Sequence, residues 1–264
     1  MSGKYLAVLL LSVGLVCQPR GAGAESVRQT PVVRALEKVS GMVVNIGTER
    51  TVALGQNPFW GPYARQFDEY YNNFFNMYGP SMVGTVQIQS LGSGTIVSPE
   101  GLIVTNAHVV GMASKIFVTM PSGEAKQATL IGTDNANDIA LIKIDAPKPL
   151  PYIQMADDAI IGETVVSIGN PLGLQNSVSA GLISGTDRTF YTQPQIEAFK
   201  ELIQTDASIN QGSSGGALIN LEGKLTGMNL AVVQNAQGLG FAIPSKKIKR
   251  MLEEYEKVRP DKKK

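Results

Sequence analysis

Three short segments of the sequence contain side chains that could act together in nucleophilic catalysis. His108 follows Thr-Asn-Ala, Asp138 precedes the apolar run Ile-Ala-Leu-Ile, and Ser214 lies within Gly-Ser-Ser-Gly-Gly. A serine hydroxyl is a weak nucleophile at neutral pH and needs a base to take its proton. Histidine has a suitable pKa for this task, and a carboxylate can hold the imidazole in the useful tautomer. The three residues are therefore a candidate His–Asp–Ser triad for acyl transfer.

The glycines around Ser214 meet a second requirement of this chemistry. The tetrahedral intermediate carries a negatively charged oxygen, and backbone N–H groups must converge on it. Such convergence needs a tight turn, whose backbone conformations glycine permits. We therefore predict an oxyanion hole formed by the N–H groups of Gly212 and Ser214, with Ser213 as a further contributor.

The order of the candidate residues along the chain decides between two catalytic folds. Each residue alone has an ordinary structural explanation, as a turn residue, a loop residue or a structural histidine. Gly212-x-Ser214-x-Gly216 also matches the nucleophile elbow of α/β-hydrolases, in which the acid and the histidine follow the serine. His108 is the only histidine in the chain, and it precedes Ser214. This order argues against the elbow and is that of the chymotrypsin-like double barrel.

Short strands must position these residues. Apolar and β-branched runs separated by Gly, Pro, Asn and Asp predict an all-β protein of antiparallel barrels. Together with the His–Asp–Ser order, they favour a chymotrypsin/trypsin-like double β-barrel with short N-terminal and C-terminal helices. We expect barrel 1 over about 40–145 and barrel 2 over about 155–244. One helix should begin at Thr30-Pro31, and 245–264 should hold a helix and a basic tail. The strands are expected at 42–46, 83–89, 95–97, 102–105, 115–120, 128–132, 140–144, 164–168, 177–184, 217–221, 225–231 and 240–243.

One segment departs from the strand pattern. Residues 59–78 hold 9 of the 17 aromatic residues, and several of these recur at helical spacing. That spacing places them along one face of a short helix. We therefore predict an aromatic insertion over 48–82, in the loop between the first two strands.

The N-terminus has the pattern of a secretory signal peptide. Lys4 is followed by an apolar run over 6–16, and Ala-Gly-Ala at 22–24 is a cleavage site that would leave Glu25 as the first mature residue. A membrane anchor is the alternative, but a spanning helix needs about 20 apolar residues. Lipidation at Cys17 is a second alternative, which the bulky residue before it disfavours. The sequence thus predicts an exported protein without a stable membrane anchor.

Composition excludes several classes of partner. Removing the signal also removes the only cysteine and two of the 23 basic residues, which leaves 21 basic against 22 acidic residues and a net charge of −1. The sequence has no basic stripe that would indicate nucleic-acid binding. One histidine without cysteines makes no metal cluster. We expect no metal, no cofactor and no nucleic-acid partner.

Six ordered motifs resemble those of the HtrA/DegP family of trypsin-like serine proteases in bacterial envelopes. The resemblance covers about residues 30–250, within an expected protease domain over 25–250. It implies two perpendicular barrels with the active site between them. It also implies that His108 and Asp138 come from the first barrel and Ser214 from the second. The motifs are Gly-Ser-Gly-Thr-Ile-Val (92–97), Thr-Asn-Ala-His-Val-Val (105–110), Asn-Asp-Ile-Ala-Leu-Ile-Lys-Ile (137–144), Ile-Gly-Asn-Pro-Leu-Gly-Leu (168–174), Ile-Gln-Thr-Asp-Ala-Ser-Ile-Asn-Gln-Gly-Ser-Ser-Gly-Gly (203–216) and Gly-Phe-Ala-Ile-Pro (240–244).

The sequence also departs from the family pattern. Ser213 stands where the family usually has asparagine, and Gln211 where proline or arginine is common. Most relatives continue into PDZ domains, whereas this sequence ends 20 residues after Gly-Phe-Ala-Ile-Pro. The expectation is a protease domain without peptide-gated control through a PDZ domain.

Ser208 indicates the substrate preference. Trypsin-type enzymes that cleave after Lys or Arg place an acid six residues before the nucleophile, and Ser208 occupies that position. A basic side chain would therefore be buried unpaired, at high cost. With Ile209 and Met228 as apolar pocket residues, we predict cleavage after small or medium aliphatic residues of unfolded chains that present an extended strand.

The resemblance further implies regulation within a homotrimer. The aromatic insertion, with Phe74 and Phe75, aligns with a loop that can enter a neighbouring subunit, although its stripe could instead pack on its own barrel. Arg188 resembles the sensor-loop arginine, although it could be a surface charge. The leading hypothesis is a periplasmic serine endopeptidase that degrades misfolded envelope proteins. The alternative is a non-proteolytic chaperone or scaffold that binds unfolded proteins.

Overall fold

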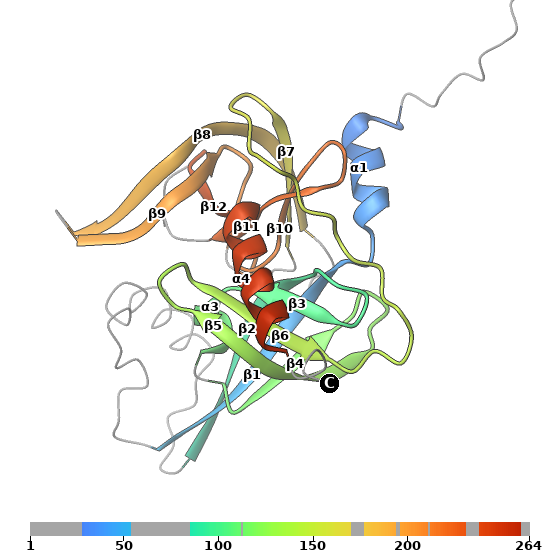
Figure 1. Ribbon diagram of the computed structural model, residues 1–264, viewed down its shortest axis with the longest axis vertical. Coiled ribbons are helices and arrows are strands. Elements are labelled where there is room, and N and C mark those ends of the chain that lie inside the picture. The colour runs from blue at the N-terminus through green and yellow to red at the C-terminus, as the bar shows by residue number, and fades with distance from the viewer. Residues whose placement is uncertain are drawn as a thin grey trace, which may run out of the picture.

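The strands form two closed barrels (Figure 1). The computed structural model describes residues 28–53, 85–111, 113–169, 177–193, 196–210, 212–230 and 238–259. The first barrel consists of β1 (Val43–Ala53), β2 (Thr85–Ile96), β3 (Leu102–Thr105), β4 (Lys115–Thr119), β5 (Ala125–Asp134) and β6 (Ile139–Ile144). The second consists of β7 (Thr164–Gly169), β8 (Ser177–Gln193), β9 (Ile196–Thr205), β10 (Ala217–Asn220), β11 (Leu225–Leu230) and β12 (Gly240–Pro244).

Both barrels have the same antiparallel topology. Around the ring, the strands run β1-β2-β3-β6-β5-β4 in the first barrel and β7-β8-β9-β12-β11-β10 in the second. In each barrel the first strand pairs with the fourth and closes the ring. The described helices are few and short, which confirms the predicted all-β double barrel.

Successive residues of the central strands face two different apolar cores. Ile103 of β3 belongs to a cluster formed by residues of the first barrel. Its chain neighbours Leu102 and Val104 belong to a cluster to which both barrels contribute. Neighbouring side chains on a strand point to opposite faces, so the continuous apolar run of β3 supplies both cores. The second of these cores contains residues of both barrels and so joins them.

Two helices add to the core between the barrels. Thr30 accepts a hydrogen bond from the Val33 N–H at 3.3 Å and caps α1 (Pro31–Val39), as the sequence predicts. Ala35 of α1 is fully buried in the shared cluster. Ile248 of α4 (Ser245–Val258) is also fully buried there. Burial of such side chains is the main force that holds both helices in place.

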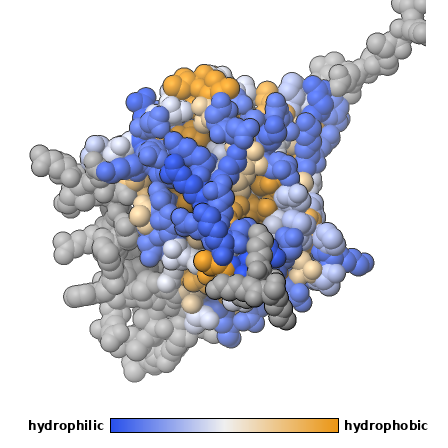
Figure 2. Space-filling view, in the orientation of Figure 1, coloured by the Kyte–Doolittle hydropathy of each residue, from blue (hydrophilic) through white to orange (hydrophobic). Residues whose placement is uncertain are grey.

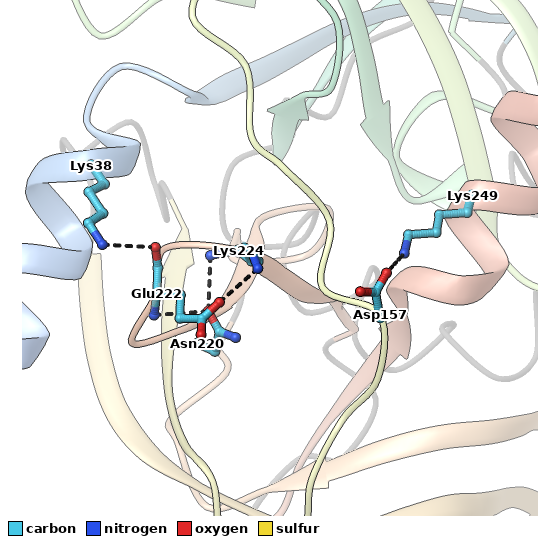
Figure 3. Close-up of polar contacts among 6 residues, drawn as sticks. All are labelled: Lys38, Asp157, Asn220, Glu222, Lys224 and Lys249. Carbon is cyan, nitrogen blue, oxygen red and sulfur yellow. Dashed lines mark hydrogen bonds and ion pairs between the residues drawn. The ribbon is translucent and has the colours of Figure 1, made fainter.

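Charged contacts also join the helices to the second barrel (Figure 3). Lys38 of α1 donates to the backbone carbonyl of Glu222 at 3.2 Å, and Lys249 of α4 pairs with Asp157 at 2.8 Å. A hydrogen bond from Lys224 lowers the pKa of the Glu222 carboxyl. Exposed ion pairs of this kind contribute little to stability. They therefore add little to the burial of Ala35 and Ile248, which holds the two helices in place.

The long hairpin of β8 and β9 differs from the sequence-based expectation. No strand is predicted over 196–205, and the preceding strand is predicted to end at Ser184. Instead, β8 continues to Gln193 and pairs with β9 from Ile183 onward, with several register shifts. Arg188 therefore lies within β8 and not after it, which corrects its predicted place. Its Nε donates to Gln204 Oε1 at 3.0 Å, so the side chain bridges the two strands.

The segment between β1 and β2 is also shorter than predicted. Because β1 extends to Ala53 and β2 begins at Thr85, residues 48–53 belong to a strand and not to the aromatic insertion. The remainder of the insertion, including Phe74 and Phe75, lies outside the described residues, as does the predicted signal peptide.

Candidate active site

His108 and Asp138 meet at the edge of the first barrel. His108 lies in the single-turn helix α3 (Ala107–Val110), directly after β3, and Asp138 directly precedes β6. The His108 Nδ1 and Asp138 Oδ2 atoms lie 2.7 Å apart, and the His108 backbone N–H donates to Asp138 Oδ1 at 2.9 Å. A carboxylate only accepts hydrogen bonds, so this contact favours the tautomer with the proton on Nδ1. The lone pair of Nε2 is then available to take a proton.

The backbone of Asp138 is held in an uncommon conformation. Its φ is 55°, in the left-handed region that aspartate adopts more readily than most residues. Two donors bind the Asp138 carbonyl: Asn106 Nδ2 at 3.0 Å and the Ala107 N–H at 3.1 Å. Because β3 pairs with β6, these donors lie opposite the aspartate. Asn106 is a site residue that sequence reasoning missed, and its only local signal is its place two residues before His108.

Ser214 lies in a tight turn that ends at β10. Gly212 and Gly215 have φ values of 82° and 83°, which other residues rarely adopt. The Ser213 N–H donates to the Asn210 carbonyl at 2.9 Å, and the Gly216 N–H donates to the Ser213 carbonyl at 2.9 Å. Gly212 thus takes the third position of a four-residue turn, where type II turns need a positive φ. The glycines are required by the turn, as the sequence suggests.

The two neighbouring serines differ in their surroundings. A Cβ placed on Gly169 would lie 2.7 Å from Ser213 Oγ, so Ser213 packs against the end of β7. Ser214 is 4% exposed, and its Oγ has no hydrogen-bond partner among the described residues. A buried hydroxyl without a partner is uncommon and calls for a functional explanation. Ser214 Oγ thus makes no hydrogen bond to His108 in this structure, and no other hydrogen bond holds it in place among the described residues.

The turn of Ser214 contacts the segment that carries His108. A Cβ on Gly215 would collide with Thr105 Oγ1 and would lie 3.2 Å from the Asn106 N atom. The absence of a side chain at Gly215 thus lets the second barrel approach the end of β3. This contact places the turn of Ser214 against the end of β3, next to the segment that carries His108.

The predicted oxyanion donors need one correction. Because the Ser213 N–H closes the turn onto the Asn210 carbonyl, it is not directed to an oxyanion in this structure. The N–H groups of Gly212 and Ser214 stay as the predicted donors. Gln211 lies outside the described residues.

The three predicted pocket residues differ in how far they are buried. Ser208 is exposed, and its N–H donates to Ser179 Oγ at 2.9 Å. Ile209 is half-buried and packs against Gly240. Met228 is fully buried in the core between the barrels and has no surface exposed to solvent. The pocket assignment stays a prediction.

The described residues include neither a metal-binding cluster nor a membrane-spanning helix. No group of three or more His, Cys, Asp or Glu side chains in the described ranges is placed to hold a metal ion. None of the described helices is both long and apolar enough to cross a membrane.

The double barrel and the His108–Asp138 pair define a class of protein, the trypsin-like peptidases, which divide their catalytic residues between two barrels. A family model described as the trypsin-like peptidase domain matches residues 92–228. The chain is 39% identical over 272 residues to the periplasmic serine endoprotease DegP of Escherichia coli, covering 93% of this chain and 57% of that protein. It is 36% identical over 280 residues to a probable DegP-like periplasmic serine endoprotease of Chlamydia pneumoniae, covering 95% of this chain and 56% of that protein.

Solved structures agree with these relatives. The HtrA-type protease AlgW with a bound decapeptide matches with a TM-score of 0.66 and 33% identity, covering 86% of this chain and 67% of that one. The chain therefore belongs to the HtrA type of the trypsin-like peptidase family. It spans about half the length of the curated relatives that it matches.

Proposed function

We propose that this protein is a serine endopeptidase in which Ser214 is the nucleophile, His108 the general base and Asp138 the residue that orients the imidazole. The observation that carries the proposal is the 2.7 Å contact between His108 and Asp138, together with an unpartnered Ser214 hydroxyl at the same junction. The names of the relatives, which are serine endoproteases, support it.

The reaction follows from these roles. Ser214 Oγ attacks the carbonyl carbon of the scissile peptide bond while His108 Nε2 takes its proton. The N–H groups of Gly212 and Ser214 stabilise the oxyanion. His108 then donates the proton to the leaving amine, and the acyl-enzyme forms. A water molecule, deprotonated by the same imidazole, hydrolyses this ester and regenerates Ser214.

Degradation of unfolded casein tests the activity most simply. The mature protein should fragment casein, the Ser214→Ala variant should not, and Ser213→Ala, a matched change one residue away, should retain most of the activity. If casein survives in all three samples and its aggregation is suppressed, the non-proteolytic chaperone or scaffold is the better account.

The proposed substrates are unfolded or misfolded envelope proteins, and the proposed compartment is the periplasm. Two observations support this assignment: the signal-peptide pattern of the first 24 residues and the relatives described as periplasmic endoproteases. An extended, unfolded chain can present the strand-like backbone that a protease cleft binds. The role is therefore protein quality control.

Cleavage specificity gives a first prediction. With Ser208 at the position of an acid in Lys/Arg-specific enzymes, a peptide library should be cut mainly after small or medium aliphatic residues. Ser208→Asp should increase cleavage after Arg or Lys relative to Val. The new carboxylate would pair with the cationic side chain of the substrate in the pocket. Mass spectrometry of the products measures both. A wild-type profile dominated by Arg or Lys would overturn the assignment.

Self-association gives a second prediction. We propose a homotrimer in which the aromatic insertion, including Phe74 and Phe75, limits the resting activity, with Arg188 as a sensor residue. Figure 2 shows an apolar area at the end of the second barrel that is uppermost in the view, and this barrel exposes Ile160 and Ile161, which are 58% and 63% accessible. Exposed apolar areas of this kind often mark protein contacts.

Deleting residues 59–78 tests the role of the insertion. The deletion should raise basal casein hydrolysis or weaken the trimer, measured by light scattering after size exclusion. An unchanged trimer with unchanged turnover would contradict the regulatory role of the insertion.

A further inference from the structure

A buried serine of the first barrel contacts the turn of the candidate nucleophile. Ser93 lies on β2 and is fully buried. Its backbone N–H donates to the Ser214 carbonyl at 2.8 Å, and its Oγ donates to the Gly212 carbonyl at 2.6 Å. One residue therefore binds two carbonyls of the nucleophile turn, which belongs to the other barrel.

The strand pairing of β2 explains why Ser93 can reach across. Ser93 pairs with Asn45 of β1 on one side of β2, whereas the ladder between β2 and β3 on the other side starts at Thr95, so there Ser93 faces the turn of Ser214. Buried backbone groups must find partners, and the turn of Ser214 supplies one. On the same edge, the Ser93 carbonyl accepts a hydrogen bond from Thr105 Oγ1 at 2.7 Å.

The absence of a Cβ at Gly215 permits this contact. A Cβ there would collide with the Ser93 carbonyl as well as with Thr105 Oγ1. Gly215 thus lets the turn lie directly against β2. Because the turn lies against β2, the Gly212 carbonyl is close enough to accept the hydrogen bond from Ser93 Oγ.

The Gly212 carbonyl is a sensitive point of the turn. It belongs to the peptide unit between Gly212 and Ser213, and a peptide unit rotates as a plane. Glycine offers little resistance to such rotation. Fixing this carbonyl restricts the ψ angle of Gly212, next to one of the predicted oxyanion donors. A hydrogen bond from Ser93 therefore acts on the geometry that stabilises the transition state.

We infer that Ser93 is a positioning residue, which fixes the Gly212–Ser213 peptide from the opposite barrel and so keeps the oxyanion hole formed. The inference rests on the proposed endopeptidase function. It assigns to Ser93 an effect on the rate of the chemical step and not on the binding of substrate. It also links barrel association to catalysis, because the donor and the acceptor belong to different barrels.

The test compares Ser93→Ala with Thr95→Val. Thr95 is also fully buried on β2, and its hydroxyl donates across the junction to the Gly215 carbonyl, but at 3.4 Å and to a different peptide. Both variants lose one buried hydroxyl, so they share any general cost in stability. With a fluorogenic peptide, kcat of Ser93→Ala should fall by about 10- to 100-fold, less than for loss of an oxyanion donor itself, with KM within about 2-fold of the wild type. Thr95→Val should retain kcat within about 3-fold, as expected for a weak, long hydrogen bond.

Two further measurements test the role of Ser93 in ways that do not depend on the endopeptidase activity alone. Hydrogen exchange of the peptide covering 210–216 should be faster in Ser93→Ala than in Thr95→Val, and this readout needs no turnover. If Ser93→Ala does not fold, Ser93→Cys keeps a weaker donor and should show an intermediate kcat. The inference fails if Ser93→Ala or Ser93→Cys keeps the wild-type kcat, if KM alone changes, or if Thr95→Val loses as much kcat. It fails also if exchange over 210–216 is unchanged. An inactive wild type with faster exchange in Ser93→Ala would reject the endopeptidase and leave the positioning of the turn supported.

Discussion

Asp138→Asn is expected to lower kcat by about 10,000-fold with little change in KM. Asp138 accepts two hydrogen bonds from His108, one from the ring Nδ1 and one from the backbone N–H. An amide in its place can turn its NH₂ group to the ring and hold the tautomer that carries its proton on Nε2. That tautomer cannot take the proton of Ser214. Kinetics with a fluorogenic peptide measure the loss.

Asp134→Asn is the matched control for this prediction. Asp134 lies just before the same turn, and its two carboxylate oxygens accept hydrogen bonds from Asn137 at 3.1 and 2.6 Å. These bonds do not involve the imidazole of His108. This variant should keep kcat within about 3-fold, because it changes only local turn contacts. Equal losses in the two variants would mean that the turn as a whole matters and that Asp138 has no special role.

His108→Ala is expected to have the larger effect, a loss of about a million-fold in kcat, because it removes the base itself. The sequence contains no second histidine that could take its place. The imidazole is mostly buried, with 14% of the side chain exposed, so folding must be checked by circular dichroism and thermal unfolding. A folded His108→Ala variant with more than a tenth of the wild-type kcat would contradict the role of His108 as general base.

The sequence predicts the double barrel and proposes a candidate triad, but it does not predict the contacts that position those residues. The candidate triad can be proposed because its three residues lie in short local motifs, and chain order distinguishes the double barrel from the α/β-hydrolase fold. The strand over 102–105 is predicted with its observed bounds, because an apolar run between turn residues is a local signal. Ser93 and Asn106 lie within quoted motifs, but nothing in those motifs shows which atoms the two side chains bind. Their importance depends on which carbonyl lies opposite each donor, and that is a property of the folded barrels.

The strand β9 shows a second limit of sequence reasoning. Its sequence, Ile-Glu-Ala-Phe-Lys-Glu-Leu-Ile-Gln-Thr, is rich in residues that favour helices. It forms a strand because it pairs with β8 on one side and β12 on the other, and because Phe199, Leu202 and Ile203 are buried. Tertiary pairing here overrides local propensity.

The two barrels share one topology, although the sequence shows no internal repeat. A closed barrel requires alternation of inward and outward side chains and a consistent register, and many sequences satisfy both. What differs between the barrels is the chemistry at their junction. The first contributes His108, Asp138 and the proposed positioning residue Ser93, and the second contributes the turn of Ser214.

Covalent labelling with a fluorophosphonate tests the central claim most directly. The reagent reacts with a serine hydroxyl that a neighbouring base activates, and peptide mass mapping identifies which serine is modified. We expect a single adduct on Ser214, none on the adjacent Ser213, and a labelling rate that falls by at least about 1,000-fold in His108→Ala, because the hydroxyl is then not activated. Labelling of Ser213, or equally fast labelling of Ser214 in His108→Ala, would contradict the account.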